Sequence, residues 1–340
     1  MEVWYGAEQV PTTLSAPGGP GSVVAIGVFD GVHRGHQAIL GRVVERAHEL
    51  AAGGRRPLAV AVTFDPHPRR VHRPEEDLPL IASLTDRLSS LEGVGLDAVL
   101  VIAYDLDFAA QGPREFVRTW LEGLLGVRAL VVGGDVRFGR SNSGDAATLE
   151  EIGAADGFEV EILGEIRSGG GRRWSSTWIR ELLASGDVAG AARVLGRSHR
   201  IRGQVVHGFR RGREIGFPTA NLTGDGLGEV PADGVYAGWL VRSVPGSKAA
   251  EYLPAAISVG TNPHFEGTER TVEVHALGRS DLNLYGESIA VDFVEYLRPM
   301  LSFESLDGLL RQMDEDLRVT AEILGVPTAG RVDPAAVTAT

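Results

Sequence analysis

The stretch GVFDGVHRGH, residues 27–36, decides the fold of the N-terminal half of this chain. An apolar run from Val23 leads into it, and apolar residues at helical spacing follow it: Ile39, Leu40, Val43, Val44, Ala47 and Leu50. We therefore predict a buried strand, a turn through two glycines, and a helix. Glycines let a backbone approach a ligand closely, and the N-terminus of a helix attracts anions.

Short apolar runs continue to alternate with amphipathic segments as far as residue 132. Residues 58–63, 98–102 and 129–132 are predicted strands, and residues 84–91 and 116–125 are predicted helices. This alternation is typical of a parallel sheet covered by helices. Ligands bind such sheets beyond the carboxyl ends of the strands, which here means the turns at 27–35, 65–68 and 133–139.

From about residue 200 the sequence changes to short β-like runs separated by Gly, Asn and Pro, which indicates an antiparallel barrel or a sandwich. A last amphipathic helix is predicted through Phe303, Leu306, Leu310, Met313 and Leu317. The 340 residues exceed what one hydrophobic core usually organises. We expect a first domain over 1–186, a second over 187–326, and a flexible tail over 327–340.

Composition excludes several kinds of chemistry. The chain has no cysteine, so thiolate nucleophiles, disulfides and cysteine-ligated metals are absent. Lys248 is the only lysine, which excludes a P-loop and a kinase that depends on a strand lysine. The net charge of −12 argues against nucleic-acid and anionic-membrane partners. Without a long apolar stretch or an export signal, we expect a cytoplasmic protein.

Two segments carry candidate anion chemistry, and each also has a simpler interpretation. His33 and His36 could stabilise phosphate charge or bind a metal, but they could also belong to an ordinary hydrogen-bonded loop. Residues 197–214 carry six arginines against one acid, Glu214, which gives a local charge of +5. Such a run is usually a solvated face, yet a positive segment in an acidic protein is also what an anion site requires.

Longer motifs identify a family. The sequence GVFDGVHRGH resembles the phosphate-binding element of nucleotidyltransferases, and WSSTWIR (174–180) is similar to their SSTxIR element. TFDPHP (63–68) and VGGDVRFG (132–139) resemble elements of prokaryotic FAD synthetases. GFPTAN (216–221), TVEVH (271–275) and LYG (284–286) resemble riboflavin kinases. The resemblance spans residues 20–325 and points to a bifunctional prokaryotic riboflavin kinase/FAD synthetase.

The resemblance implies a Rossmann-like nucleotidyltransferase domain that adenylylates FMN to FAD with ATP and releases pyrophosphate. His33, His36 and Arg180 would then be catalytic, stabilising phosphate charge. Asp135 would contact the nucleotide or the flavin, and Ser176 and Thr177 would grip pyrophosphate oxygens at a helix start. The same resemblance assigns nucleotide binding to the turn residues Gly27, Phe29, Asp30 and Gly31.

For the second half, the resemblance implies a β-barrel kinase domain that phosphorylates riboflavin to FMN with ATP. Glu273 would be the general base on the ribityl 5′-hydroxyl, and Thr219 and Asn221 would hold Mg²⁺ and phosphates. ATP phosphates would also meet Gly203, Arg210, Gly212 and Arg213. Riboflavin, FMN and ATP are the expected partners, with a homo-oligomer as an open alternative to a single chain.

Two other functions remain open on the sequence. Gly134 and Val136 depart from the FAD synthetase pattern, so the chain could be a paralogue that acts on a flavin analogue or has only one working site. A flavin-binding regulator or carrier without turnover is the alternative from another class. The presence of His33, His36, Thr219, Asn221 and Glu273 argues against it.

Overall fold

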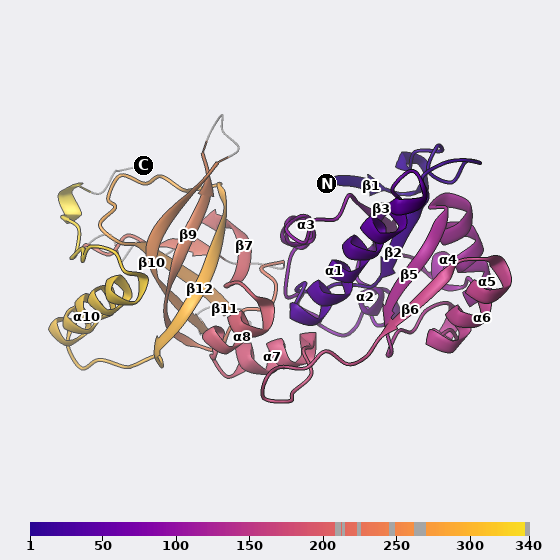
Figure 1. Cartoon of the computed structure of the whole chain (residues 1–340). Helices are drawn as coiled ribbons and strands as arrows, with labels where there is room; N and C mark the ends of the chain where they lie inside the picture. The colour runs from indigo at the N-terminus through magenta and orange to yellow at the C-terminus, as the bar shows by residue number, and fades with distance from the viewer. Residues whose placement is uncertain (208–211, 213–214, 223–225, 245–248, 262–269, 337–340) are drawn as a thin grey trace. The chain divides into compact units, whose positions relative to one another are not determined.

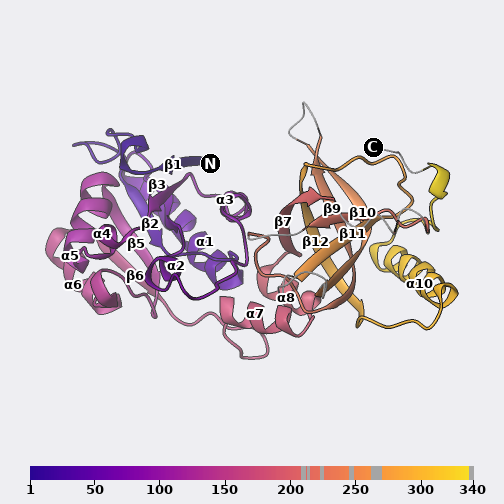
Figure 2. The same cartoon turned by 180° about the vertical axis from the view of Figure 1, so that it is seen from behind.

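A computed structural model describes the chain except residues 208–211, 213–214, 223–225, 245–248, 262–269 and 337–340. The chain divides into two compact units, drawn in Figures 1 and 2. The first comprises residues 1–78 and 84–175, and the second comprises residues 79–83 and 176–340. This division falls before the residue 186 expected from sequence, because the helix that starts at Ser176 packs on the following helix. Among the described residues, no helix combines the length and apolarity needed to span a membrane.

The first unit is built on a parallel sheet with strand order β1-β4-β3-β2-β5-β6. Every strand pair in it is parallel, as the alternating sequence pattern predicted. Its strands are β1 (Glu2–Tyr5), β2 (Ser22–Ile26), β3 (Leu58–Asp65), β4 (Ala98–Ala103), β5 (Val127–Gly133) and β6 (Glu159–Leu163). The carboxyl ends of β2, β3 and β5 carry the turns in which the sequence placed ligand binding.

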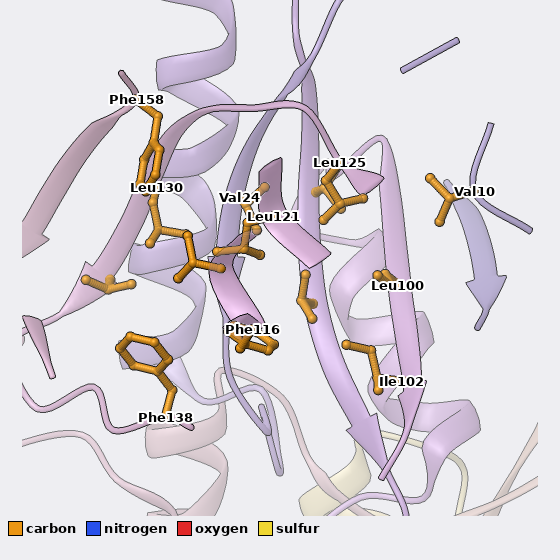
Figure 3. Packing of buried hydrophobic residues seen from close by; sticks show 14 of the residues in the cluster. Val10, Val24, Leu100, Ile102, Phe116, Leu121, Leu125, Leu130, Phe138 and Phe158 are labelled. Carbon is orange, nitrogen blue, oxygen red and sulfur yellow. The ribbon is translucent and has the colours of Figure 1, made fainter. Parts of the chain in front are cut away.

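Alternate residues of each central strand bury on opposite faces of this sheet. In β2, Val23 and Ala25 pack with the helices α1 (Arg34–Glu49) and α3 (Leu84–Glu92). Val24 faces the other side, where Figure 3 shows it with Phe116, Leu121 and Leu130. That second face is covered by α5 (Pro113–Phe116), the π-helix η3 (Val117–Leu124) and α6 (Ala146–Asp156). Both faces are thus dry, which accounts for the continuous apolar strands.

Short helices occupy the remaining connections of the first unit, namely η1 (Ala7–Gln9), η2 (Leu50–Gly53), α2 (Pro68–His72), α4 (Leu106–Ala109) and η4 (Arg140–Asn142).

The second unit is a closed antiparallel barrel, which decides between the barrel and the sandwich that the sequence left open. Its strand order is β10-β11-β8-β7-β12-β9. The strands are β7 (His199–Val206), β8 (Ala220–Leu222), β9 (Gly234–Ser243), β10 (Ala250–Thr261), β11 (Arg270–Ala276) and β12 (Ser288–Arg298). Two helices precede them, α7 (Ser176–Ala184) and α8 (Val188–Leu195), and α10 (Leu306–Leu324) follows, ahead of the short η5 (Pro334–Ala336).

The predicted C-terminal helix is α10, and it covers an apolar cluster on the outside of the barrel around Phe217 and Leu317. The segment after it crosses the same cluster: the Val332 N–H donates to the Gly216 carbonyl at 3.1 Å. Arg331 pairs with Asp314 of α10 at 3.1 Å. The chain beyond α10 therefore lies directly against the residue that precedes Phe217.

Candidate functional site

The loop between β2 and α1 has an unusual backbone. Phe29, Gly31 and Val32 all adopt positive φ, at 52°, 80° and 41°. Only Gly31 takes this conformation without steric strain, and for a β-branched residue such as Val32 it is rare. The turn brings His33 to the N-cap of α1, where the His33 Nδ1 accepts from the His36 backbone N–H at 3.3 Å. This bond leaves the proton of a neutral His33 on Nε2.

The two predicted catalytic histidines lie together and are uncharged at neutral pH. Their rings stack with centroids 3.6 Å apart, and His33 is only 5% exposed. Burial lowers the pKa of His33 to about 4, with Arg173 adding to the effect and Asp30 opposing it. Burial also lowers the pKa of His36, and the neighbouring His33 and Arg173 reinforce this. The pair can therefore donate hydrogen bonds from neutral rings.

Arg173 acts electrostatically on both histidines, and we did not predict it from the sequence. The Arg173 guanidinium forms an ion pair with Asp135, a predicted ligand residue from the loop after β5. The cation that lowers the pKa of both histidines is therefore paired with Asp135. The available signal was the arginine pair at 172–173, directly before the WSSTWIR stretch.

The other predicted residues of this loop take different positions. The Phe29 side chain is buried at 3% exposure and contacts His36 edge-on, with ring centroids 5.3 Å apart, so only its backbone can meet a ligand. Asp30 is also buried, at 5% exposure. Gly27 lines a cavity of about 200 Å³ in the first unit.

Five of the residues that line that cavity are aromatic. Phe64 belongs to the TFDPHP stretch of the sequence. Tyr104 and Phe108 come from the region after β4 and were not predicted. The Tyr104 hydroxyl is 2.9 Å from the His72 Nε2. Val136 lines the cavity as well, so one of the two departures from the family pattern lies at its wall. A flat aromatic ring system suits such a lining.

Three further residues assigned to the first site lie on a helix of the second unit. Ser176, Thr177 and Arg180 belong to the first turns of α7. Within that unit, Arg180 donates from Nη2 to the Pro79 carbonyl at 3.2 Å and pairs with Glu229 at 3.3 Å. The structure brings the three together on α7. Their action at the loop between β2 and α1, residues 27–33, which we call the histidine loop, stays a prediction.

In the second unit, strand register brings the predicted kinase residues together. β8 and β11 are antiparallel, and Asn221 is paired directly with Glu273. The Thr219 hydroxyl hydrogen-bonds to the Glu273 carboxylate, while burial raises the pKa of Glu273 and outweighs this bond. Three oxygen-bearing side chains from distant parts of the sequence thus form one cluster.

His275, two residues after Glu273 on β11, holds the backbone at Pro218 in place. The His275 Nδ1 lies 2.9 Å from the Pro218 carbonyl, so the ring donates from Nδ1. Burial lowers the pKa of His275, which keeps it neutral. His275 therefore fixes the peptide that leads into Thr219. No role was predicted for this histidine from the sequence.

A cavity of about 40 Å³ adjoins Thr219. Its lining includes Pro218, Arg279 and Tyr285, the last from the predicted LYG element. The Tyr285 ring stacks on His207, with centroids 3.9 Å apart. Arg279, which is paired with Asp281 and Glu251, was not predicted from the sequence.

The remaining predicted nucleotide residues are distributed unevenly. Gly203 lies within β7, where a Cβ would come within 2.5 Å of a Leu227 methyl group, so a larger residue would have to displace that side chain. Gly212 accepts from the Phe217 N–H at 2.7 Å, which closes the turn before Thr219. Arg210 and Arg213 lie outside the described residues.

The first unit combines a parallel sheet covered on both faces with a loop suited to binding phosphate. The second unit combines a barrel with a carboxylate beside hydroxyl and amide oxygens. Together these features define an enzyme with two phosphate-transfer sites. Family models agree: FAD synthetase matches residues 17–178 and riboflavin kinase matches residues 195–324. The chain belongs to the bifunctional riboflavin kinase/FMN adenylyltransferase family. It is a transferase that uses ATP to phosphorylate riboflavin and to adenylylate FMN.

Individual relatives span nearly the whole chain. A bifunctional riboflavin kinase/FMN adenylyltransferase of Pseudomonas fluorescens is 37% identical over 312 residues, covering 92% of this chain and 95% of its own length. That of Escherichia coli (strain K12) is 36% identical and covers 90% of this chain and 94% of its own. A crystal structure described as a macrolide-efflux protein from Streptococcus pneumoniae has a TM-score of 0.79 at 29% identity, covering 94% of this chain and 99% of that one.

Proposed function

We propose that the first unit binds the flavin ring of FMN in its aromatic cavity and activates ATP at the histidine loop. The observation that carries this proposal is the neutral, stacked His33–His36 pair at the start of α1, a few residues after Gly27 at the cavity wall. An oxygen of the FMN phosphate attacks the α-phosphorus of ATP, and the bond to pyrophosphate breaks. No covalent intermediate with the enzyme is needed.

Charge develops on the α-phosphate during this transfer, and the loop supplies donors for it. The His33 Nε2–H, the His36 ring, and the amides around Gly31 at the N-terminus of α1 would hydrogen-bond these oxygens. Arg173, held by Asp135, would add the positive charge that neutral histidines lack. We further propose that Ser176, Thr177 and Arg180 hold the departing pyrophosphate.

We propose that the second unit transfers the γ-phosphoryl of ATP to the 5′-hydroxyl of riboflavin. Glu273 accepts the proton of that hydroxyl. Burial raises its pKa toward neutral pH, and a general base works best when its pKa is near the working pH. Thr219 and Asn221 supply the hard oxygen donors that Mg²⁺ prefers, and the ion would neutralise charge on the ATP phosphates. Gly203, Gly212, Arg210 and Arg213 are the proposed neighbours of those phosphates.

The structure contains no group of three or more His, Asp or Glu side chains around one point among its described residues. Mg²⁺ is commonly held by one or two protein oxygens together with substrate phosphates, a role that Thr219 and Asn221 would fill. We assign the kinase to residues 187–326 and the adenylyltransferase to residues 1–186, and leave 327–340 outside both. We also propose a cytoplasmic location, no nucleic-acid or membrane partner, and self-association as a property to be measured by sedimentation.

Product chromatography of two full-length variants tests the proposal. With riboflavin, ATP and Mg²⁺, His36→Ala should accumulate FMN without FAD. Glu273→Ala should form no FMN from riboflavin, yet should still convert added FMN to FAD. Loss of both activities in either folded variant would refute the separation of the two sites.

One observation bears on the alternative that the chain acts on a flavin analogue. Val136 lines the flavin cavity, whereas Gly134 is not among its lining residues. Of the two departures from the family pattern, Val136 is therefore the one that can alter flavin selection. Comparing FMN with ring-modified analogues in the wild-type protein and in Val136→Phe would show a preference for an analogue if the chain serves one.

A further inference from the structure

Arg87 of α3 is a charged side chain buried beneath the histidine loop, and none of the roles above uses it. Its side chain is only 2% exposed. Burial lowers its pKa, and the nearby carboxylates of Asp65 and Asp30 oppose this effect. A buried arginine is costly unless its charge and donors serve a purpose.

The contacts of Arg87 are directed at one peptide of the loop. Its Nη1 donates to the Val28 carbonyl at 3.0 Å. The same carbonyl accepts from the Thr63 hydroxyl at 3.0 Å. Arg87 Nη2 lies 3.5 Å from the Asp65 Oδ1, an ion pair that anchors the guanidinium to the end of β3. Two donors from different elements thus hold one carbonyl oxygen.

The internal hydrogen bonds of Arg87 remain incomplete. Among the described residues, neither its Nε nor its Nη2 has a hydrogen-bond acceptor. Buried donors without acceptors destabilise a fold, so these two nitrogens do not explain why an arginine stands at this position. The contact that does is the hydrogen bond to the loop.

Holding the Val28 carbonyl fixes the direction of the next amide. The Val28–Phe29 peptide is trans, so its C=O and N–H point in opposite directions. With the carbonyl drawn toward Arg87, the Phe29 N–H must point away from Arg87. Among the described residues this N–H has no acceptor. Val28 lies at the wall of the flavin cavity, and Arg87 does not line it.

The loop also needs an external restraint. Phe29 and Val32 hold left-handed conformations that non-glycine residues avoid, so the loop would relax if nothing held it. Arg87 contacts it immediately before Phe29. The buried guanidinium and the strained turn are therefore parts of one arrangement.

We propose that Arg87 is a positioning residue for FMN adenylylation: by holding the Val28 carbonyl, it keeps the Phe29 amide oriented as a hydrogen-bond donor for substrate phosphate. This inference rests on the proposed function of the histidine loop. Arg87 acts through the peptide and does not itself touch the substrate. The kinase unit makes none of these contacts and serves as a control within the same chain.

The test uses three full-length variants, Arg87→Met, Arg87→Lys and Thr63→Val, assayed for both activities. Arg87→Met should lower kcat/KM for FMN adenylylation about 10- to 100-fold, the usual effect of losing a charged hydrogen bond. Arg87→Lys should recover part of this loss. Thr63→Val removes the neutral donor to the same oxygen and should cost no more than about fivefold. Riboflavin phosphorylation should stay within about twofold in all three.

Two readouts separate positioning from simple loss of stability. A partly unfolded population lowers kcat at unchanged KM, whereas a misdirected amide also raises KM for ATP. Hydrogen exchange in peptides covering residues 27–33 should accelerate in the same order as adenylylation declines. If Arg87→Met fails to fold, the same comparison between Arg87→Lys and Thr63→Val decides the question.

Adenylylation within twofold of wild type in folded Arg87→Met, or in an Arg87→Lys variant whose loop exchanges faster, would overturn the inference. His36→Ala, run alongside, tells the two failures apart. If His36→Ala keeps adenylylation, the proposed site itself is wrong. If His36→Ala loses it and the Arg87 variants do not, only the positioning role is wrong.

Discussion

Replacing His33 by Asn should make the free energy of unfolding of the first unit less sensitive to acid pH. Asn is a good N-cap, so the bond to the His36 N–H can be kept while the titrating ring is removed. In the wild type, burial holds the pKa of His33 at about 4 in the folded state, against 6.5 when unfolded. Well above pH 6.5 both states are almost entirely deprotonated, so the titration of His33 takes nothing from the stability.

As the pH falls below 6.5, the unfolded state gains a proton that the folded state cannot accept, so stability is lost. The loss approaches its full value only near pH 4, where a shift of this size corresponds to about 3 kcal/mol. Between pH 7.5 and pH 5 it amounts to about 2 kcal/mol. His33→Asn should lose about 2 kcal/mol less than wild type over that interval.

Urea unfolding at pH 7.5 and pH 5, read by a short thermolysin pulse and mass spectrometry of first-unit peptides, measures this difference. Peptides from the barrel report the second unit in the same samples and should show no difference between the two proteins. Equal acid sensitivity of wild type and His33→Asn in the first unit would refute the neutral-histidine account of the loop.

The remaining predictions concern the kinase unit. Glu273→Gln should reduce riboflavin phosphorylation about 10²- to 10⁴-fold, and wild-type kcat/KM should fall on the acid side at a pH above 4.5, because burial raises the pKa of this base. Asp316→Ala removes the carboxylate that Arg298 contacts at 2.6 Å and should cost the barrel about 1.5–3 kcal/mol in thermal unfolding, because the arginine is partly exposed. Gly216→Ala should weaken riboflavin phosphorylation and destabilise the barrel by at least about 1–2 kcal/mol, because φ is +85° and the new Cβ would lie 2.5 Å from the Val332 carbonyl. Truncating the Gly216→Ala variant after residue 326 removes Val332 and should relieve the collision but not the φ strain. Thermal unfolding of this double variant should therefore show that only part of the lost stability is recovered.

The architecture of both units could be predicted because it depends on the local spacing of apolar residues. Val23 and Val24 bury on opposite faces of one sheet, and a run of such residues indicates a doubly covered strand. The strand β1 was missed because its only partner, β4, lies far along the chain and its four residues carry no pattern of their own. The barrel was distinguished from a sandwich only by strand pairing.

The sites followed a similar division. The resemblance predicted Asn221 and Glu273 as kinase residues, and only strand register shows that they are neighbours. Arg173 was missed although it directly precedes the WSSTWIR stretch, because its partner Asp135 lies far from it in the sequence. Arg87 could not be found, because its contact with the loop is to a backbone carbonyl. Contacts of this kind leave no spacing in the sequence.

The central claim is that one chain carries two independent phosphate-transfer sites, and mixing two inactive partners tests it most directly. Full-length His36→Ala and Glu273→Ala, each alone with riboflavin, ATP and Mg²⁺, should form no FAD. Mixed in equal amounts they should form FAD, because the first variant releases FMN and the second adenylylates it. A mixture that accumulates FMN without FAD, or that forms neither, would contradict the claim.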